Sequence, residues 1–366
     1  MLRKNRVLLT LIIVTGLLVP LVNAADSTTY VYKLDYTFEN RGDEDFPLER
    51  EDYTLPLFIN NTRQTVTILN ISQGYTREII DTDGNWGAIM DVDETLSPGE
   101  TMSFSIEYQI ESTSQERPSF SMDDAEGFNA IPSSLVSMYT GHTESFTVDD
   151  PTIIDVAQRA SKGDETVLGT VANLLEYVTQ NTTYCNFETP RYPLDTLSDN
   201  LGDCDDQSIL LISMARSLGI PAYLKVGVII HPNIVDSDTS WEGHLENEAD
   251  GIGWHGWVMI YIPPWGWVPV DLTLVEEDTG LEYIINAPEY DPNIIEALDV
   301  SEQSYIGDTI VTRDRIIASD LHVTIIDEAN QIYSNGLGNE SYMILVIGAA
   351  LAGAIFMMFR ASNRDQ

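Results

Sequence analysis

The sequence of 366 residues predicts an α+β protein in which an all-β, sandwich-like domain comes before an α+β core. Near the start of the chain, large residues alternate with small or polar ones, which is the two-residue period of a strand. After about residue 148, apolar residues recur every three or four positions, as in helices, and strand-like segments follow. Uncharged apolar segments close to both ends add a predicted export signal and a predicted membrane helix.

The beginning of the chain is typical of a secretory signal peptide. Basic residues are followed by an uncharged apolar run from Val7 to Val19, and small residues stand from Val22 to Ala24, where cleavage is expected. We therefore predict a signal peptide over residues 1–24. An uncleaved anchor is the alternative, although the apolar run is short for a membrane span.

The second apolar segment, from Tyr342 to Phe359, contains no charged residue. At ~1.5 Å per helical residue it nearly crosses a hydrocarbon core of ~30 Å, so we predict a transmembrane helix over residues 341–360. Arg360 and Arg364 follow it, and the positive-inside rule then makes residues 361–366 a cytoplasmic tail. We expect a single-pass protein of the cell membrane whose bulk is extracytoplasmic.

The charge of the chain is strongly negative. Aspartate and glutamate number 58 against 18 lysines and arginines, for a formal net charge of −40. Such a surface repels nucleic acid, so we expect no nucleic-acid partner. Many carboxylates with few lysines are typical of proteins that work in concentrated salt, which makes a salt-adapted, archaeal source our hypothesis.

Residues 25–148 are predicted to form the sandwich-like β-domain. A shorter strand is indicated around Val66, and Ser97 to Glu100 supplies a turn. The large alternating residues are Tyr30, Tyr32, Leu34, Tyr36 and Phe38 in one strand, and Met102, Phe104, Ile106, Tyr108 and Ile110 in another. A spacer or a binding module are the available roles, and a spacer is the more economical.

Three helices are predicted next. The first begins at Asp150-Pro151, a favoured helix start, and the second runs from about Glu165 to Tyr177. The third begins at Cys204 or Asp205 and has a broad apolar side. It ends at Gly219, which suits the left-handed position just past a helix.

Strands are predicted after the helices. One runs from Tyr223 to Ile230, and a hairpin pairs His255 to Ile262 with Trp267 to Asp271 about the turn at residues 263–266. The acidic stretch from Asp236 to Asp250 is interpreted as a solvated loop, with Ca²⁺ binding as the alternative. The tryptophans in and beside this hairpin are interpreted as core and cleft walls rather than a ligand cage.

Residues 276–340 are predicted to be a β-rich extension followed by a linker. Strand-like runs cover Ser304 to Ile317 and Leu321 to Ile326. These residues indicate no function.

The chemistry of the chain centres on Cys204, at the start of the third helix. Free backbone N–H groups and the positive end of the helix dipole favour a thiolate there, and the thiolate is the nucleophile. Asp203, Asp205 and Asp206 oppose this, because negative charge raises a thiol pKa, but they also suit helix capping. A disulfide with Cys185 and a buried inert thiol are the alternatives.

His255 and Asp271 are the candidate partners of this cysteine. Folding the predicted hairpin brings Asp271 roughly across from His255, within a register error of one or two residues. An imidazole held by a carboxylate on rigid strands is the arrangement that nucleophilic catalysis needs. We expect His142, His231, His244 and His322 on the surface or in loops, although His244, in the acidic stretch, could reach the cleft.

Four sequence segments resemble the core of the transglutaminase-like superfamily. Gly202 to Asp206 resembles its helix start, and Ala215 to Ala222 resembles the end of that helix. Trp254 to Trp257 resembles the family's histidine strand, and Trp265 to Thr273 resembles its aspartate strand. The order of cysteine, histidine and aspartate also agrees.

The resemblance implies a papain-like α+β fold for residues 149–275. In this fold Cys204 attacks a carboxamide or peptide carbonyl, His255 carries the proton and Asp271 orients the histidine. The backbone N–H of Cys204 would be one donor to the oxyanion. No cofactor or metal is expected.

The expected function is that of a cysteine-nucleophile hydrolase, a peptidase or amidase, acting on peptide or protein amides. A protein-glutamine transamidase that forms cross-links is one alternative, and a non-catalytic surface binding protein that retains the fold is the other. The chain departs from the family pattern at Gly256, where alanine is frequent, and in its acidic stretch, which would reshape one wall of the cleft.

Overall fold

The computed structural model describes residues 27–332. The predicted signal peptide (1–24), the membrane helix (341–360) and the tail (361–366) therefore lie outside the described residues. Within residues 27–332, no helix has both the length and the apolar character needed to cross a membrane.

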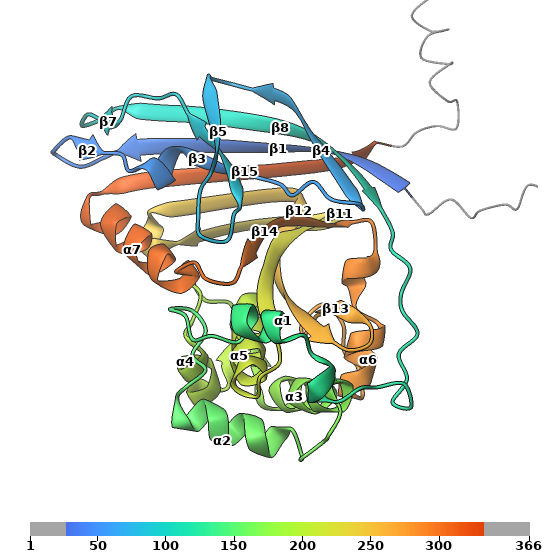
Figure 1. Cartoon of the computed structure of the whole chain (residues 1–366). Coiled ribbons are helices and arrows are strands. Elements are labelled where there is room, and N and C mark those ends of the chain that lie inside the picture. The colour runs from blue at the N-terminus through green and yellow to red at the C-terminus, as the bar shows by residue number, and fades with distance from the viewer. Residues whose placement is uncertain (1–26, 333–366) are drawn as a thin grey trace, which may run out of the picture.

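The molecule has two tiers (Figure 1). Long strands form the upper tier. Most helices pack below one end of the sheet, and α7 lies at its side. The helices are α1 (Ser133–Tyr139), α2 (Pro151–Ala160), α3 (Val167–Asn181), α4 (Pro193–Asp199), α5 (Cys204–Ser217), α6 (Gly280–Ile285) and α7 (Tyr305–Ala318).

One eight-stranded sheet runs through the molecule in the order β14-β11-β12-β15-β1-β8-β4, and β13 pairs with β12 beside this path. Its strands are β1 (Ser27–Asn40), β4 (Gln64–Ile71), β8 (Thr101–Thr113), β11 (Ala222–Ser240), β12 (Leu245–Ile262), β13 (Gly266–Val270), β14 (Ile294–Val300) and β15 (Leu321–Ile332).

Three smaller sheets complete the strands of the described residues. They pair β3 (Thr54–Leu57) and β5 (Tyr75–Ile79) with β6 (Trp86–Met90), β2 (Phe46–Pro47) with β7 (Thr95–Leu96), and β9 (Thr183–Tyr184) with β10 (Leu201–Gly202).

The predicted elements of the core form where their sequence signals indicate. Asp150 caps α2 by accepting a hydrogen bond from the Thr152 N–H. α5 starts at Cys204 after the cap Asp203, and Gly219 takes the left-handed conformation just past its end, at φ 83°. The strands predicted in the β-domain and the hairpin of β12 and β13 are also present.

β15 joins the two ends of the chain into one sheet. It pairs antiparallel with β1 along its whole length and parallel with residues 245–250 of β12. A shared hydrophobic core therefore contains Tyr32 and Tyr108 from the predicted β-domain together with Val228 and Ile295 from the strands of the core. The boundary at residue 148 stays a prediction, because the strands on both sides of it pack in the same core.

The second hydrophobic core lies between the helices α2, α3 and α5 and the strands β11, β12 and β13. Apolar residues of the helices pack there against apolar residues of the strands. The helices contribute Ile153, Val171, Leu175 and Leu211, and the strands contribute Leu224, Val258 and Val270. The apolar side of α5 is wholly buried in it, as its broad apolar pattern predicts.

The prediction of a solvated loop for Asp236 to Asp250 was wrong. β11 and β12 continue through this stretch as a hairpin, with pairs from Val235↔Asp250 to Ser240↔Leu245. The carboxylates occupy exposed positions of the strands. The hairpin pairs with β15, a strand some seventy residues further on in the sequence. The local charge pattern of the acidic stretch gives no sign of this distant pairing.

The predicted strand over Ser304 to Ile317 was also wrong, because Tyr305–Ala318 is the helix α7. The β-branched residues of this segment favour a strand locally. Ile306 and Ile316 are nevertheless buried on one side of a helix, so tertiary packing overrides the propensity. The neighbouring prediction, a strand over Leu321 to Ile326, is confirmed by β15.

A buried arginine binds the backbone of residues 289–294, at and just before the start of β14, to the N-terminal strands. Arg63, just before β4, is 5% exposed and donates to the carbonyl oxygens of Glu289, Asp291 (2.9 Å) and Ile294 (2.6 Å). Its guanidinium also lies 3.8 Å from the carboxylate of Glu296. These bonds span more than 220 positions of the chain.

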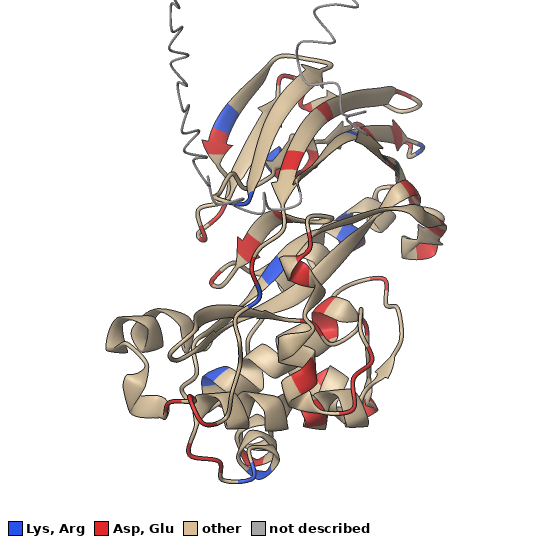
Figure 2. Ribbon diagram, turned by 90° about the vertical axis from the view of Figure 1, so that its right-hand side faces the viewer, with Lys and Arg blue, Asp and Glu red and all other residues tan. Residues whose placement is uncertain are grey.

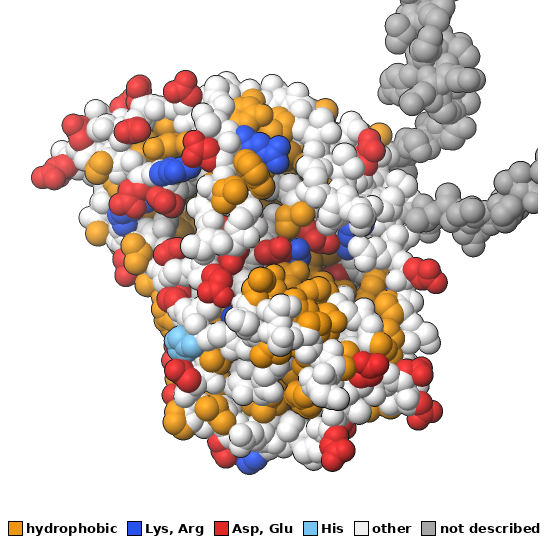
Figure 3. Space-filling model, viewed as in Figure 1, with side chains coloured by type: hydrophobic (Ala, Val, Ile, Leu, Met, Phe, Trp, Pro, Cys, Tyr) orange, Lys and Arg blue, Asp and Glu red, His pale blue; other side chains and the backbone are white. Residues whose placement is uncertain are grey.

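Acidic residues are spread over both tiers. Figure 2 shows them on strands, helices and loops alike, with few basic residues between them. The face in Figure 3 carries acidic groups around its edge and an apolar area over its middle.

The Arg63 contacts predict a large effect on stability. In Arg63→Met three carbonyl oxygens lose a charged donor, so we expect the free energy of unfolding to fall by about 3 kcal/mol. Urea denaturation of the full-length protein measures this. Arg159→Met, which removes an exposed pair with Asp155, is the matched control and should cost about 0.5 kcal/mol or less. Equal losses in the two variants would contradict the anchoring role.

Candidate active site

Cys204 is the first residue of α5, and a reciprocal cap holds this helix start. The Asp203 carboxylate accepts from the Asp206 N–H at 3.4 Å, and the Asp206 carboxylate accepts from the Asp203 N–H at 3.3 Å. Asp206 is fully buried and also accepts from the Arg191 N–H at 2.7 Å. The predicted capping role of the aspartates is thereby confirmed for Asp203 and Asp206.

The start of α5 packs closely against β12 at Gly256. A Cβ on Gly256 would lie 3.0 Å from the Cβ of Asp205, so the glycine permits this approach. The Ser208 hydroxyl donates to the Cys204 carbonyl at 2.7 Å and contacts the Gly256 carbonyl at 3.4 Å. The backbone of Gly256 also hydrogen-bonds to the Cys204 sulfur. The sulfur therefore lies at the peptide that joins His255 to Gly256.

His255 and Asp271 form a buried pair. They are 4% and 0% exposed, and the imidazole Nε2 is hydrogen-bonded to Asp271 Oδ2. The register pairs Val258 with Val270, so Asp271 follows the end of β13 two positions away from a direct alignment with His255. This offset lies within the register error expected from the sequence.

The other oxygen of Asp271 is also occupied. Oδ1 accepts from the backbone N–H groups of Thr273 and Leu274, each at 2.7 Å. Burial alone would raise the pKa of Asp271, but the hydrogen bond and the charge of His255, followed by the neighbouring Glu289 and the Leu274 backbone N–H, lower it below its ordinary value. Asp271 is therefore an ionised acceptor.

The protonation of His255 follows from this acceptor. An ionised carboxylate only accepts, so Nε2 carries the proton in that bond. In the neutral imidazole Nδ1 then holds the free lone pair, which is the position from which a base takes a proton.

The electrostatics of the cysteine differ from those of a preformed thiolate. Burial raises the pKa of the Cys204 thiol, and the charges of Asp205 and Asp203 raise it further, against the hydrogen bond from Gly256. The resting thiol is therefore neutral at pH 7. The helix dipole is outweighed by burial and by the neighbouring acids, so Cys204 needs a base to become a nucleophile.

The segment that holds these residues matches a known protein family. Residues 154–272 match the family model of the transglutaminase-like superfamily. This segment is a transglutaminase-like core domain. The match includes Cys204, His255 and Asp271 and confirms the resemblance noted in the sequence. Comparison with curated proteins gives no match.

Two solved structures are similar to this chain at low sequence identity, and the first of them has the same fold. A candidate cysteine protease from Cytophaga hutchinsonii is 13% identical, with a TM-score of 0.52, over 85% of this chain and 93% of that chain. The periplasmic domain of TgpA from Pseudomonas aeruginosa, bound to ethylmercury, is 15% identical, with a TM-score of 0.33, over 69% of this chain and 91% of that chain.

Two residues near the site of the transglutaminase-like core come from the C-terminal extension, and sequence reasoning missed both. The Tyr305 hydroxyl, at the start of α7, donates to Asp205 at 3.0 Å. Glu289 lies beside His255 and Asp271. Neither belongs to a motif, so no local signal could have identified them.

The acids at the start of α5 affect one another's pKa. Burial, together with Asp203, raises the pKa of Asp206 to about 7, and burial also raises the pKa of Asp205 well above its ordinary value.

The structure bears on the disulfide alternative for Cys204 and on the positions of two other histidines. Cys185 and Cys204 are both free thiols. His244 does not reach the cleft, because it stacks on His322 with ring centroids 4.5 Å apart. His142 pairs with Asp149 on the surface.

The tryptophans divide between core and surface. Trp257 is 1% exposed and stacks beside His255, whereas Trp254 is 41% exposed. Trp267 packs edge-on against Tyr139 and Tyr223, with ring centroids 5.0 Å apart in each pair.

In the described residues, three groups of side chains are spaced closely enough to hold a metal ion. Two of them contain Cys204 or the pair of His255 and Asp271, and the third consists of His244, Asp320 and His322. Arg41 Nη1 lies 3.0 Å from His322 Nδ1, and its positive charge opposes a cation there. The Arg41 contact therefore disfavours a metal ion at this group.

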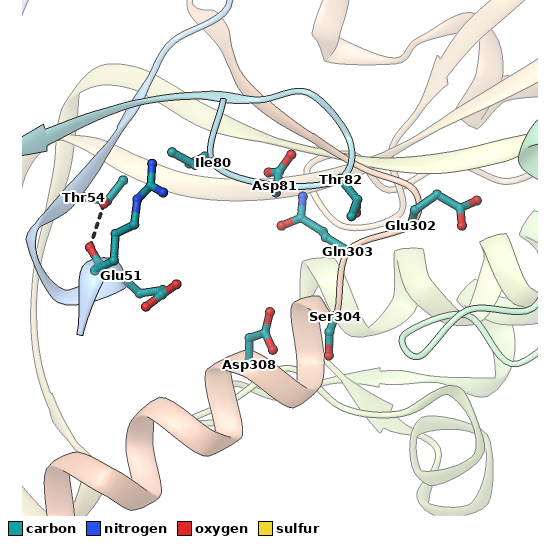
Figure 4. A pocket seen from close by; sticks show the side chains of 10 residues that line it. Glu51, Thr54, Ile80, Asp81, Thr82, Glu302, Gln303, Ser304 and Asp308 are labelled. Atoms are coloured by element: carbon teal, nitrogen blue, oxygen red, sulfur yellow. Dashed lines mark hydrogen bonds between the residues drawn. The ribbon is translucent and has the colours of Figure 1, made fainter. Parts of the chain in front are cut away.

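The cavity in Figure 4, of about 590 Å³, lies at the seam between the N-terminal strands and α7. Carboxylates surround it, from Glu51, Asp81, Glu302 and Asp308. The three predicted site residues do not line it, so it is separate from the chemistry described above.

The acids beside Cys204 predict how its reactivity changes. Asp203→Asn keeps a favoured capping residue and removes one negative charge, so the thiol pKa should fall. We expect iodoacetamide to alkylate Cys204 roughly five-fold faster at pH 7. Peptide mapping separates Cys204 from Cys185.

Asp155→Asn removes an exposed charge on α2 and serves as the control, with no change expected. An unchanged or slower rate in Asp203→Asn would show that Asp203 does not hold the thiol in its neutral form.

Proposed function

We propose that this protein is a cysteine-dependent hydrolase that cleaves amide bonds of peptides or proteins through an acyl-enzyme on Cys204. The supporting observation is the packing of the α5 start against β12, which sets the Cys204 sulfur at the peptide between His255 and Gly256. His255 is at the same time held by a buried carboxylate. A candidate nucleophile thus lies at the peptide bond of a candidate base that an acid orients, and this supports the proposal.

Acylation begins with proton transfer. His255 Nδ1 takes the proton of the Cys204 thiol as Sγ attacks the carbonyl carbon, which forms a C–S bond and a tetrahedral oxyanion. The C–N bond then breaks, and the proton passes from the imidazolium to the leaving amine. Asp271 stays ionised and stabilises the imidazolium while it exists.

The backbone N–H of Cys204 is one donor to the oxyanion. It lies in the first turn of α5, where N–H groups have no acceptor within the helix.

Deacylation uses the same groups. A water molecule loses a proton to His255 and attacks the thioester carbon; the C–S bond breaks, the acid is released and Sγ regains its proton. Water is the proposed acceptor because it needs no binding site of its own. An amine at this step would give the transamidase instead.

We further propose that the enzyme is anchored in the cell membrane with its active site outside. The support comes from the apolar segments at residues 7–19 and 342–359 and from the arginines after the second segment. Substrates would then be peptides or proteins of the cell exterior.

The proposed activity predicts a sharp dependence on Cys204. With a peptic digest of casein as substrate, the full-length protein should produce new peptide ends in mass spectra, and Cys204→Ala should reduce the rate at least about 10³-fold. Asp271→Asn should cost a similar factor, because the amide permits the wrong imidazole tautomer.

Cys185→Ala is the control and should keep full activity. Adding dansylcadaverine separates the two acceptors, since a transamidase would attach it to glutamine side chains. Cleavage that survives in Cys204→Ala, or no cleavage by the unaltered protein, would refute the proposal.

The anchoring proposal predicts a change of fraction on truncation. The full-length chain should sediment with membranes, and a chain ending at residue 340 should become soluble. Protease added to intact cells should remove the domain from the full-length form. Recovery of the full-length chain in the soluble fraction would contradict the anchor.

A further inference from the structure

Glu289 is a buried carboxyl group beside the predicted catalytic pair. It lies in the short helical turn Pro288–Tyr290 (η4) and is 2% exposed. One carboxyl oxygen of Glu289, a ring nitrogen of His255 and one oxygen of Asp271 all lie within 4.8 Å of one another. Three ionisable side chains are therefore gathered out of contact with solvent.

Glu289 lacks the donors that an ionised carboxylate needs. Within the described residues, neither of its carboxyl oxygens has a hydrogen-bond donor from another residue, and the hydrogen bond that lowers its pKa comes from its own backbone. Arg63, whose positive charge acts on Glu289, directs its donors to three backbone carbonyl oxygens instead. A buried carboxylate without donors, next to a second carboxylate, is strongly disfavoured.

Asp271 is the ionised member of the two. It accepts from His255 and from two backbone N–H groups, so donors surround it. Two adjacent carboxyl groups attract one another only when they share one proton. Because the donors stabilise the charge on Asp271, the shared proton belongs to Glu289.

We propose that Glu289 is a positioning residue that stays protonated and donates a hydrogen bond to Asp271, which holds Asp271 in the orientation that accepts from His255. Its effect on catalysis rests on the function proposed above, whereas its protonation does not. Glu289 touches neither the substrate nor the thiol and acts through Asp271.

The charges that face Glu289 are consistent with this state. Burial and the charge of Asp271 raise its pKa well above the ordinary value, and Arg63 opposes them only weakly. His255 and Tyr290 are further titratable neighbours; the Nε2 proton of His255 is directed to Asp271, and the charge of Glu289 acts on the Tyr290 phenol.

The position of Glu289 depends on the N-terminal strands. Arg63 donates to its backbone carbonyl, and the Gln115 N–H donates to the carbonyl of the next residue, Tyr290. The segments before and after the transglutaminase-like core thus meet at one side chain that supports the pair within it.

The first test measures stability against pH in full-length protein, with Glu289→Gln as the variant. Wild-type Glu289 is protonated when folded and ionised when unfolded above about pH 4.3, so its unfolded state binds fewer protons and wild-type stability falls as pH rises. Glutamine does not titrate. The ratio of folding constants, variant over wild type, should therefore rise by up to about ten-fold per pH unit above pH 4.3.

A ratio that stays constant or falls between pH 4.5 and 8 would show that Glu289 is ionised in the folded protein, and the proposal would be overturned. This test needs no substrate, so it decides the protonation of Glu289 even if the proposed hydrolase activity is absent.

The second test separates a donated hydrogen bond from simple packing. Glu289→Gln can donate to Asp271 through its amide, whereas Glu289→Met has a similar size and cannot. We expect kcat within about three-fold of wild type for Glu289→Gln and a fall of about ten-fold or more for Glu289→Met, with KM unchanged in both. The pH dependence of Cys204 alkylation should change only in Glu289→Met.

Equal activity in all three proteins, or equal losses in both variants, would contradict the positioning role. Melting temperatures accompany each measurement, and a loss in Glu289→Met that Glu289→Gln rescues is not a packing effect. If the wild-type protein shows no turnover, the alkylation profile supplies the same comparison.

Discussion

The buried carboxylate of Asp271 is the constraint around which the site is built. A charge with no exposed surface must be surrounded by donors, and these come from separate parts of the chain: His255 on β12 and the backbone after β13, with the Glu289 carboxyl beside them. Each donor that satisfies the charge is also held in place by it. The orientation of the histidine is thus a consequence of desolvation, and it requires the hairpin, the following loop and the extension to be folded together.

The same dependence explains why the N-terminal strands and the C-terminal extension belong to the structure of the core. β15 joins β1 to β12, and Arg63 binds the backbone of η4 and of the residues that follow it. Residues that look like a spacer in the sequence therefore complete a hydrophobic core and hold Glu289. The region that carries the chemistry is a third of the chain, but its geometry is supported by strands that lie outside it.

The cysteine shows how two opposed effects are resolved. The sequence places it at a helix start, where the dipole favours a thiolate, and also between aspartates, which oppose one. Burial decides the balance, because it disfavours the charged form and lets Asp203 and Asp205 act across a poorly screened distance. The proposed chemistry accordingly uses His255 as a base for a neutral thiol rather than as the partner of a standing ion pair.

The sequence by itself determined the helix start at Cys204, the hairpin that carries His255 and the transglutaminase-like pattern that contains Asp271. These are local features, because capping residues, short motifs and the hydrophobic periods of strands (two residues) and helices (about 3.6 residues) indicate them. Only the tertiary structure decided that Asp236 to Asp250 pairs as strands, that Tyr305–Ala318 is a helix and that Glu289 reaches Asp271. Each of these depends on a partner distant in the chain, and burial, which sets both packing and protonation, is a property of the folded molecule alone.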